Sequence, residues 1–348
     1  MFKDYIFELQ YNCMKGNVGE KEMRCEIKKY SDYEFFLEVE KMLTKKLEYK
    51  ENVEFYNKIK YKDFEQSILD RFSIITNQAK SLWIEESCRE DVWKDQRILC
   101  KAEARCMNNL IRIHFWKNTF EKIDNQSIEE GYLGYVVLKL SSEYNLMPWV
   151  IVPNWKVLEY GYKKIIFTYE RQVCVADEPI IIDTMPFYFQ DNVFVRSAHT
   201  KILMFSLFGH YVYDFPQLSM PCMIKDSRCY PMIQEEISYF DMIRIFESNQ
   251  ISVQLYEVLG EKYDAGENDK YIETLEENLK KRMPVIIYRG SQVFLVVGYT
   301  DESEKQYIVY DDSGYFLPRE KCSKGFINLI GKKELFSDSA DIYMIMAA

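Results

Sequence analysis

The fold is decided by residues 285–310, which read VIIYRGSQVFLVVGYTDESEKQYIVY. This stretch holds three β-rich runs, namely Val285–Tyr288, Val293–Tyr299 and Gln306–Tyr310. The first connection is Arg289-Gly290-Ser291 and the second is the polar segment Asp301–Lys305. Short connections rich in Gly, Ser and Asp favour turns between neighbouring strands. The stretch therefore predicts an antiparallel β-meander.

Two helical patterns lie upstream of the meander. Apolar residues from Ala198 to Phe208 recur at a spacing that predicts a helix packed on most sides, with Gly209 as its stop signal. Residues 269–282 predict a second helix, with Ile272, Leu275 and Leu279 on one face and charged residues outside. Helices of this kind next to a meander indicate the α+β class.

The rest of the chain predicts strands and charged helices. Strand-like runs occur at 5–9, 110–115, 134–140, 149–152, 164–167 and 179–182, and helical patterns occur at 33–46 and 61–78. The most linker-like break is Asp124-Asn125-Gln126-Ser127. We therefore expect an N-terminal mixed α/β domain over residues 1–125 and a second domain over residues 126–348.

Composition narrows the class of protein. The 348 residues are 47% hydrophobic and 29% charged, as in globular proteins, and the net charge of −10 disfavours binding to nucleic acid. No apolar stretch has the length of a membrane span, and residues 1–10 lack the apolar run of a signal peptide, so we expect a cytoplasmic protein without membrane contact. The nine cysteines form no Cys-x-x-Cys pair and the chain has no nucleotide-binding motif, so no metal or cofactor is expected.

Four segments in a fixed order carry more specific information. They are Pro186–Asp191, Ser197-Ala198-His199, Val293–Tyr299 and Ile308–Asp312. Together they resemble bacterial papain-like cysteine peptidases related to the bacteriocin-leader-processing peptidases, over roughly residues 131–320. The resemblance implies a papain-like domain, in which a central helix packs on an antiparallel sheet.

The resemblance also implies roles for individual positions. Gln190 matches the donor to the oxyanion, and Ser197 stands where the family has its nucleophilic cysteine. Gln292 stands where the family has its histidine base, and Asp311 matches the acid that orients the histidine, with Asp312 beside it as an alternative. A serine needs a base to become nucleophilic, and an amide side chain cannot take up a proton. Two of the three triad roles are therefore missing.

These departures favour a catalytically inactive homologue. We expect a peptide or protein partner to bind in the degenerate cleft between the Ser197 helix and the Gln292 strand, through hydrogen bonds to a sheet edge. The alternative is an active hydrolase or acyl-transfer enzyme that uses Ser197 with a base other than histidine. Each position also has an ordinary structural role: Ser197 as a helix N-cap, Gln190 as a surface residue in a turn, Gln292 as a polar residue at a strand edge, and Asp311 and Asp312 in an acidic turn.

Overall fold

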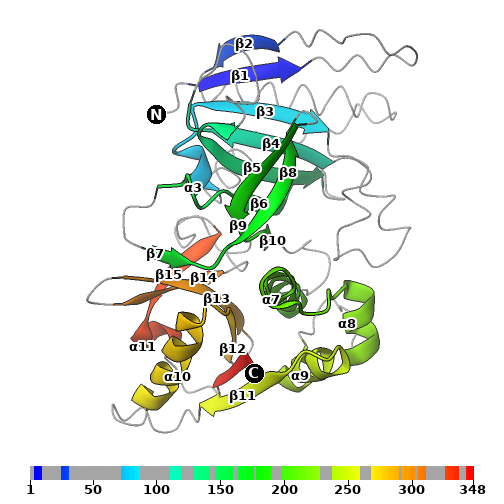
Figure 1. Ribbon diagram of the computed structural model, residues 1–348, viewed down its shortest axis with the longest axis vertical. Coiled ribbons are helices and arrows are strands. Elements are labelled where there is room, and N and C mark those ends of the chain that lie inside the picture. Colours follow the sequence, from blue (N-terminus) through cyan, green and yellow to red (C-terminus); the bar gives the residue numbers. More distant parts are fainter. Residues whose placement is uncertain are drawn as a thin grey trace, which may run out of the picture. The chain divides into compact units, whose positions relative to one another are not determined.

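The computed structural model has a mixed α/β architecture with largely antiparallel sheets (Figure 1). It describes residues 4–9, 25–30, 72–86, 110–118, 129–140, 146–159, 164–175, 178–189, 197–227, 237–258, 268–289, 292–301, 305–310, 326–336 and 342–348. The chain forms two compact units. The N-terminal unit comprises residues 1–88, 107–159 and 171–182, and the C-terminal unit comprises residues 89–106, 160–170 and 183–348.

The N-terminal unit is built around one sheet, whose strands run in the order β6-β5-β4-β3-β1-β2. Neighbouring strands pair antiparallel, except β1 and β3, which are parallel. The described elements are β1 (Asp4–Leu9), β2 (Cys25–Tyr30), α3 (Ser73–Thr76), β3 (Ser81–Glu86), β4 (Leu110–Trp116), β5 (Tyr132–Leu140) and β6 (Leu146–Pro153). Strands β8 (Tyr169–Val175) and β9 (Glu178–Thr184) form a separate two-stranded sheet.

This unit extends past Asn125, the boundary expected from the sequence. Strand β4 lies before that point and β5 after it, yet the two pair along their whole length, with Leu110 opposite Lys139. Side chains from both strands are buried, among them Ile113 and Val136. Residues 129–159 therefore share a sheet with the strands that precede them. Of the helical patterns expected near the N-terminus, 33–46 lies outside the described residues, and 61–78 is described only from residue 72, where α3 occurs.

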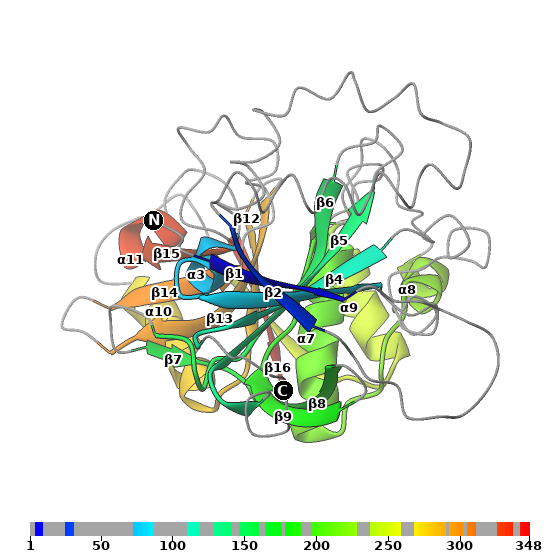
Figure 2. The same ribbon diagram turned by 90° about the horizontal axis from the view of Figure 1, so that it is seen from above.

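The C-terminal unit contains a second sheet with helices packed on it (Figure 2). The strand order is β11-β16-β12-β13-β14-β15, and β7 also pairs with β13. The strands of this sheet are β7 (Lys164–Ile166), β11 (Val253–Val258), β12 (Val285–Arg289), β13 (Gln292–Thr300), β14 (Gln306–Tyr310), β15 (Ile327–Gly331) and β16 (Ile342–Ala347). The C-terminal unit also includes the short strand β10 (Phe187–Tyr188), which is not part of this sheet. Its helices are α7 (Ser197–Tyr213), α8 (Met220–Ser227), α9 (Tyr239–Ser248), α10 (Asn268–Lys280) and α11 (Lys332–Leu335).

The meander expected from residues 285–310 is confirmed. Strands β12, β13 and β14 pair antiparallel in succession, with Arg289 opposite Gln292 and Leu295 opposite Tyr310. Helix α7 packs against β12 and β13. Tyr307 bonds to Glu276 of α10, whereas Tyr310 contacts Lys201 of α7. Because residues 307 and 310 point to opposite faces of a strand, α7 and α10 cover opposite faces of this sheet.

Helix α7 is buried as expected but does not end at Gly209. All side chains from Ala198 to Phe208 are buried, and the helix continues to Tyr213 before Asp214 adopts a positive φ of 57°. The reason for glycine at position 209 is close packing. A Cβ atom there would lie 2.6 Å from Cε2 of the Phe215 ring, so the phenyl ring occupies the space of a side chain.

Candidate functional site

The four positions matched to the peptidase family are described to different extents. Gln190 and Asp311 lie outside the described residues, as does Asp312. Ser197 is the first residue of α7, where the structure describes the backbone only. Gln292 is the first residue of β13 and its side chain is exposed. Described residues lie directly next to each of these four positions in the chain.

Those neighbours meet around Tyr310, the last residue of β14. The Tyr310 ring lies 5.3 Å from the Phe187 ring and 6.4 Å from the Phe189 ring, between centroids. Its hydroxyl donates a hydrogen bond to the carbonyl oxygen of Tyr188. The Nζ atom of Lys201, in the second turn of α7, lies 5.8 Å from the centroid of the same ring. On the adjacent strand, Leu295 is the pairing partner of Tyr310.

Tyr310 belongs to the last of the four segments of the resemblance, and two of the other three supply a residue that contacts it or pairs with it. Lys201 lies two residues after the remaining segment, Ser197-Ala198-His199. Phe189 directly precedes Gln190, and Tyr310 directly precedes Asp311. Lys201 follows Ser197 by one helical turn, and Leu295 follows Gln292 by three residues. The aromatic rings of Phe187, Phe189 and Tyr310 are almost entirely buried, so they fix these segments to one another by packing.

The position expected to match the base holds Gln292, an amide that is already hydrogen-bonded. The Oε1 atom of Gln292 accepts a hydrogen bond of 2.9 Å from Nη2 of Arg289, its partner across the β12–β13 hairpin. Arg289 also donates from Nη1 to the Glu334 carbonyl oxygen at 2.7 Å, and its guanidinium lies 5.0 Å from the centroid of the Phe294 ring. Neither a carboxamide nor a guanidinium accepts a proton near neutral pH. This pair cannot replace a histidine as the base.

Lys201 is a residue that the sequence reasoning missed. Its side chain is fully buried, with 0% exposure, and it stands four residues after Ser197 on α7. Residues four apart share one face of a helix, and long side chains lean toward the helix N-terminus. The ammonium group is therefore directed along the face of α7 that carries Ser197. The Ser-x-x-x-Lys spacing was the signal that could have identified it.

The three histidines of the chain, His114, His199 and His210, stand at positions other than the one expected for the base. His114 is buried in the N-terminal unit, where its Nδ1 atom lies 2.7 Å from the hydroxyl of Tyr132. His210 lies near the other end of α7, with Nδ1 2.7 Å from the carbonyl oxygen of Phe215. His199 is fully buried on α7, two residues after Ser197. Residues two apart do not share a helix face, so His199 is not placed as a base for Ser197.

Across the described ranges, no three His, Cys, Asp or Glu side chains gather as ligands of a metal ion would. The same residues include no helix with the length and apolar character needed to cross a bilayer. The cysteines Cys174 and Cys222 are exposed and carry free thiols.

Compared with known proteins, the chain has matches among solved structures. No protein-family model and no curated protein matches it. Among solved structures it is similar to UfSP from C. elegans, with 13% sequence identity and a TM-score of 0.34. That match spans 46% of this chain and 32% of the UfSP chain, so it corresponds to about a third of the length of that structure.

Proposed function

We propose that this protein is a catalytically inactive papain-like peptidase homologue that binds an extended peptide or protein segment. The binding site is the degenerate cleft between the N-terminus of α7 and the start of β13. The observation that carries the proposal is the state of Gln292. An exposed amide, hydrogen-bonded to Arg289, stands at the position of the family's base. Without a base, a serine hydroxyl is a weak nucleophile.

The packing around Tyr310 supports retention of the cleft. The Tyr310 ring contacts Lys201 of α7 and the two phenylalanines that precede Gln190, Phe187 and Phe189. Tyr310 also pairs with Leu295 of β13, so its strand is joined to that strand as well. Such packing holds the backbone elements around the cleft in place whether or not catalytic groups are present. A cleft that is kept without its base is suited to binding an extended peptide by hydrogen bonds to a strand edge.

The binding claim is tested with a displayed library of extended peptides of random sequence. We expect wild-type protein to enrich a defined set of peptides, and Gln292→Trp to weaken their binding at least tenfold by filling the cleft. Glu273→Trp, on the exposed face of α10, is the matched control and should bind as wild type does. Equal binding by the Gln292→Trp variant would place the peptides elsewhere and refute the proposed cleft.

A second function is favoured by Lys201. A neutral lysine serves as the base for a serine nucleophile in some hydrolases. The buried Lys201 side chain lies on the helix face of Ser197, which suits that role. In this alternative the protein is a hydrolase or acyl-transfer enzyme, and Lys201 takes the proton from Ser197.

A fluorophosphonate, which labels activated serines, separates the two functions. The inactive-homologue proposal predicts that intact mass spectrometry finds no adduct on the wild-type protein. An adduct mapped to Ser197 that disappears in a folded Lys201→Met variant establishes the hydrolase instead. Thermal unfolding of the Lys201→Met variant verifies that loss of labelling is not loss of structure.

A further inference from the structure

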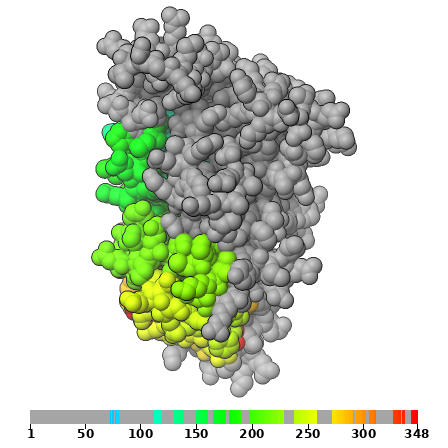
Figure 3. Space-filling view, turned by 90° about the vertical axis from the view of Figure 1, so that its right-hand side faces the viewer, coloured from blue at the N-terminus to red at the C-terminus, as the bar shows by residue number. Residues whose placement is uncertain are grey.

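A polar groove lies between α8 and α9, away from the contacts around Tyr310. These two helices pack against each other on the molecular surface, shown in yellow-green and yellow in Figure 3. The groove is lined by Lys225 and Asp226 from the last turn of α8 and by Arg244 and Ser248 from α9. Arg244 and Ser248 are four residues apart, so they share the face of α9 that borders the groove.

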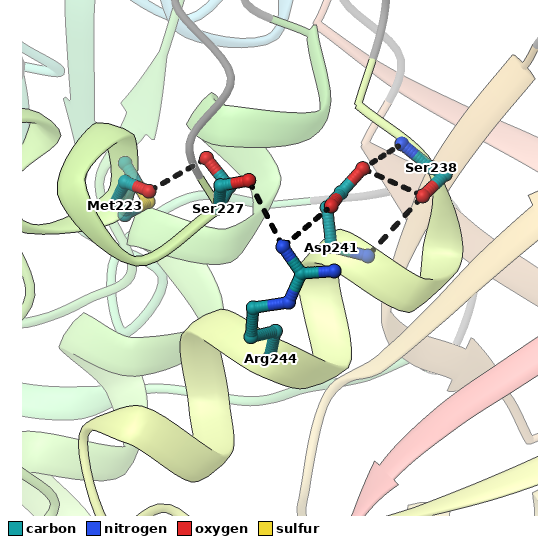
Figure 4. A network of polar contacts seen from close by, with 5 residues as sticks. All are labelled: Met223, Ser227, Ser238, Asp241 and Arg244. Atoms are coloured by element: carbon teal, nitrogen blue, oxygen red, sulfur yellow. Dashed lines mark hydrogen bonds and ion pairs between the residues drawn. The ribbon is translucent and has the colours of Figure 1, made fainter.

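The guanidinium of Arg244 is held in place by contacts at one nitrogen (Figure 4). Its Nη1 atom donates to the Ser227 carbonyl oxygen at 3.2 Å and lies 3.5 Å from Oδ1 of Asp241. Asp241 is fixed by the capping box at the start of α9, where its carboxylate accepts from the hydroxyl of Ser238 at 2.6 Å. Within the described residues, Nε and Nη2 of Arg244 have no acceptor, and half of the side chain is exposed.

The other charged residues of the groove differ in how they are paired. Lys225 is exposed and has no hydrogen-bond or ion-pair partner in the described part of the chain. Asp226 accepts a hydrogen bond of 2.6 Å from Nδ2 of Asn249, which also donates to the Ile245 carbonyl oxygen. The lining therefore carries two cations and one carboxylate, and the Asp241 carboxylate lies 3.5 Å from Nη1 of Arg244.

We propose that this groove binds a carboxylate of an acidic peptide segment, between Lys225 and the outer edge of the Arg244 guanidinium. A guanidinium presents parallel N–H donors that match the two oxygens of a carboxylate. A carboxylate can accept from the Lys225 ammonium and from Nε and Nη2 of Arg244, and the Asp226 and Asp241 carboxylates repel a phosphate dianion more strongly than a singly charged carboxylate. Small-molecule sites are typically lined by apolar side chains. This polar surface groove is better suited to a segment of another polypeptide.

The test is fluorescence anisotropy at low ionic strength, where screening of exposed charges is weakest. The probes are a labelled, C-terminally amidated peptide of alternating glycine and glutamate, its glutamine counterpart, and that glutamine peptide with a free C-terminal carboxylate. Binding of either carboxylate-bearing peptide, without binding of the amidated glutamine peptide, is the expected result. Which of the two binds distinguishes a side-chain carboxylate from a terminal one.

Variants that remove a cation and the variant that removes a carboxylate should shift the affinity for the peptide in opposite directions. Lys225→Gln should weaken binding about threefold, whereas Asp226→Asn, which keeps an acceptor for Asn249, should strengthen it about threefold. Arg244→Gln should weaken it at least tenfold, with thermal unfolding as the check that α8 and α9 remain packed. Lys280→Gln, an exposed lysine at the end of α10, is the matched charge control and should have no effect.

Three results would overturn the inference. One is equal binding of all three peptides or of none, and another is affinity unchanged by both Lys225→Gln and Asp226→Asn. The third is that inorganic phosphate displaces the labelled peptide better than acetate does, and that the Lys225→Gln and Asp226→Asn variants change this displacement in the same way. That result would indicate a site for small anions rather than for a peptide carboxylate. The inference does not rest on the cleft of the proposed function, so Gln292→Trp should leave this binding intact even where it abolishes binding at the cleft.

Discussion

At the residue scale, the chemistry of the site follows from residue types that can be read from the sequence. Ser197 and Gln292 cannot act together as nucleophile and base, because a serine hydroxyl needs a base and an amide side chain does not take up a proton. This conclusion follows from the residue types alone. The hydrogen bond between Gln292 and Arg289 was not predictable in the same way, because it depends on the pairing of β12 with β13. Lys201 was missed because lysine is rarely fully buried. The Ser-x-x-x-Lys spacing places the two residues on one helix face but does not show that the lysine side chain is buried.

A pH-dependent prediction concerns Tyr307. Burial raises the pKa of its hydroxyl, and the negative charge and hydrogen bond of Glu276 raise the pKa further. In the unfolded chain the hydroxyl ionises near pH ~10. The contribution of the neutral hydroxyl to stability is therefore fully present below about pH 10 and is lost as the pH rises toward the folded-state pKa.

We expect Tyr307→Phe to reduce the loss of stability in alkali. Between about pH 10 and 11, the unfolding free energy of the variant should fall less steeply than that of the wild type, by up to ~1.4 kcal/mol per pH unit. Urea denaturation at a series of pH values measures the two slopes. Parallel curves for the two proteins over this interval would contradict the assignment.

At the element scale, strands with clear turn signals were predicted best. Strand β14 has the bounds expected from the sequence, and β12 and β13 differ from expectation by a residue at one or both ends. The end of α7 was predicted wrongly because glycine at 209 serves close packing with Phe215, a contact that local sequence does not reveal. A glycine can mark either a helix end or a close approach, and only tertiary packing distinguishes the two.

Gly298 on β13 allows β7 to pair with that strand. A Cβ atom at this position would lie 3.0 Å from Cα of Ile166 and still closer to the carbonyl oxygen of Ile165. Gly298→Ala should therefore push β7 away and destabilise the protein by ~1–3 kcal/mol. The amide of Phe167, which donates to the Val297 carbonyl oxygen at 2.9 Å, should exchange its hydrogen at least tenfold faster.

The matched control for Gly298→Ala is Gly331→Ala at the end of β15. A Cβ atom at Gly331 would meet nothing within 4 Å, and its φ of −72° suits any residue. We expect this variant to lose at most ~1 kcal/mol, because Gly331 is the N-cap of α11 and alanine is a poorer N-cap than glycine. Hydrogen exchange and urea denaturation of the two variants compare them directly. Equal stability of the two would refute the role given to Gly298.

At the scale of the whole molecule, the sequence predicted the α+β class but not which strands share a sheet. Composition and spacing identify strands one by one, whereas the pairing of β4 with β5 across the linker-like break at Asn125 is a long-range contact. The units of the structure are accordingly made of several separate stretches of chain.

This pairing predicts how fragments of the protein behave. A fragment of residues 126–348 contains β5 and β6 without β4, so apolar side chains such as Leu133, Val136 and Leu138 lose their cover. We expect it to aggregate more than a fragment of residues 160–348, which omits β5 and β6 altogether. Analytical size exclusion of the two fragments at equal concentration measures the difference. A monomeric 126–348 fragment beside an aggregated 160–348 fragment would contradict the assignment of these strands.

The most direct test of the central claim, a papain-like cleft without its catalytic groups, is the pH dependence of alkylation by iodoacetamide in a Ser197→Cys, Gln292→His double variant. A thiolate–imidazolium pair keeps a cysteine reactive well below pH ~7, whereas an unpaired thiol loses reactivity below its ordinary pKa of about 8.5. Peptide mapping separates position 197 from the exposed Cys174 and Cys222, and Ser197→Cys alone is the control. We predict reactivity that persists in acid for the double variant only. Identical pH profiles for the single and double variants would show that positions 197 and 292 do not meet, and would contradict the account.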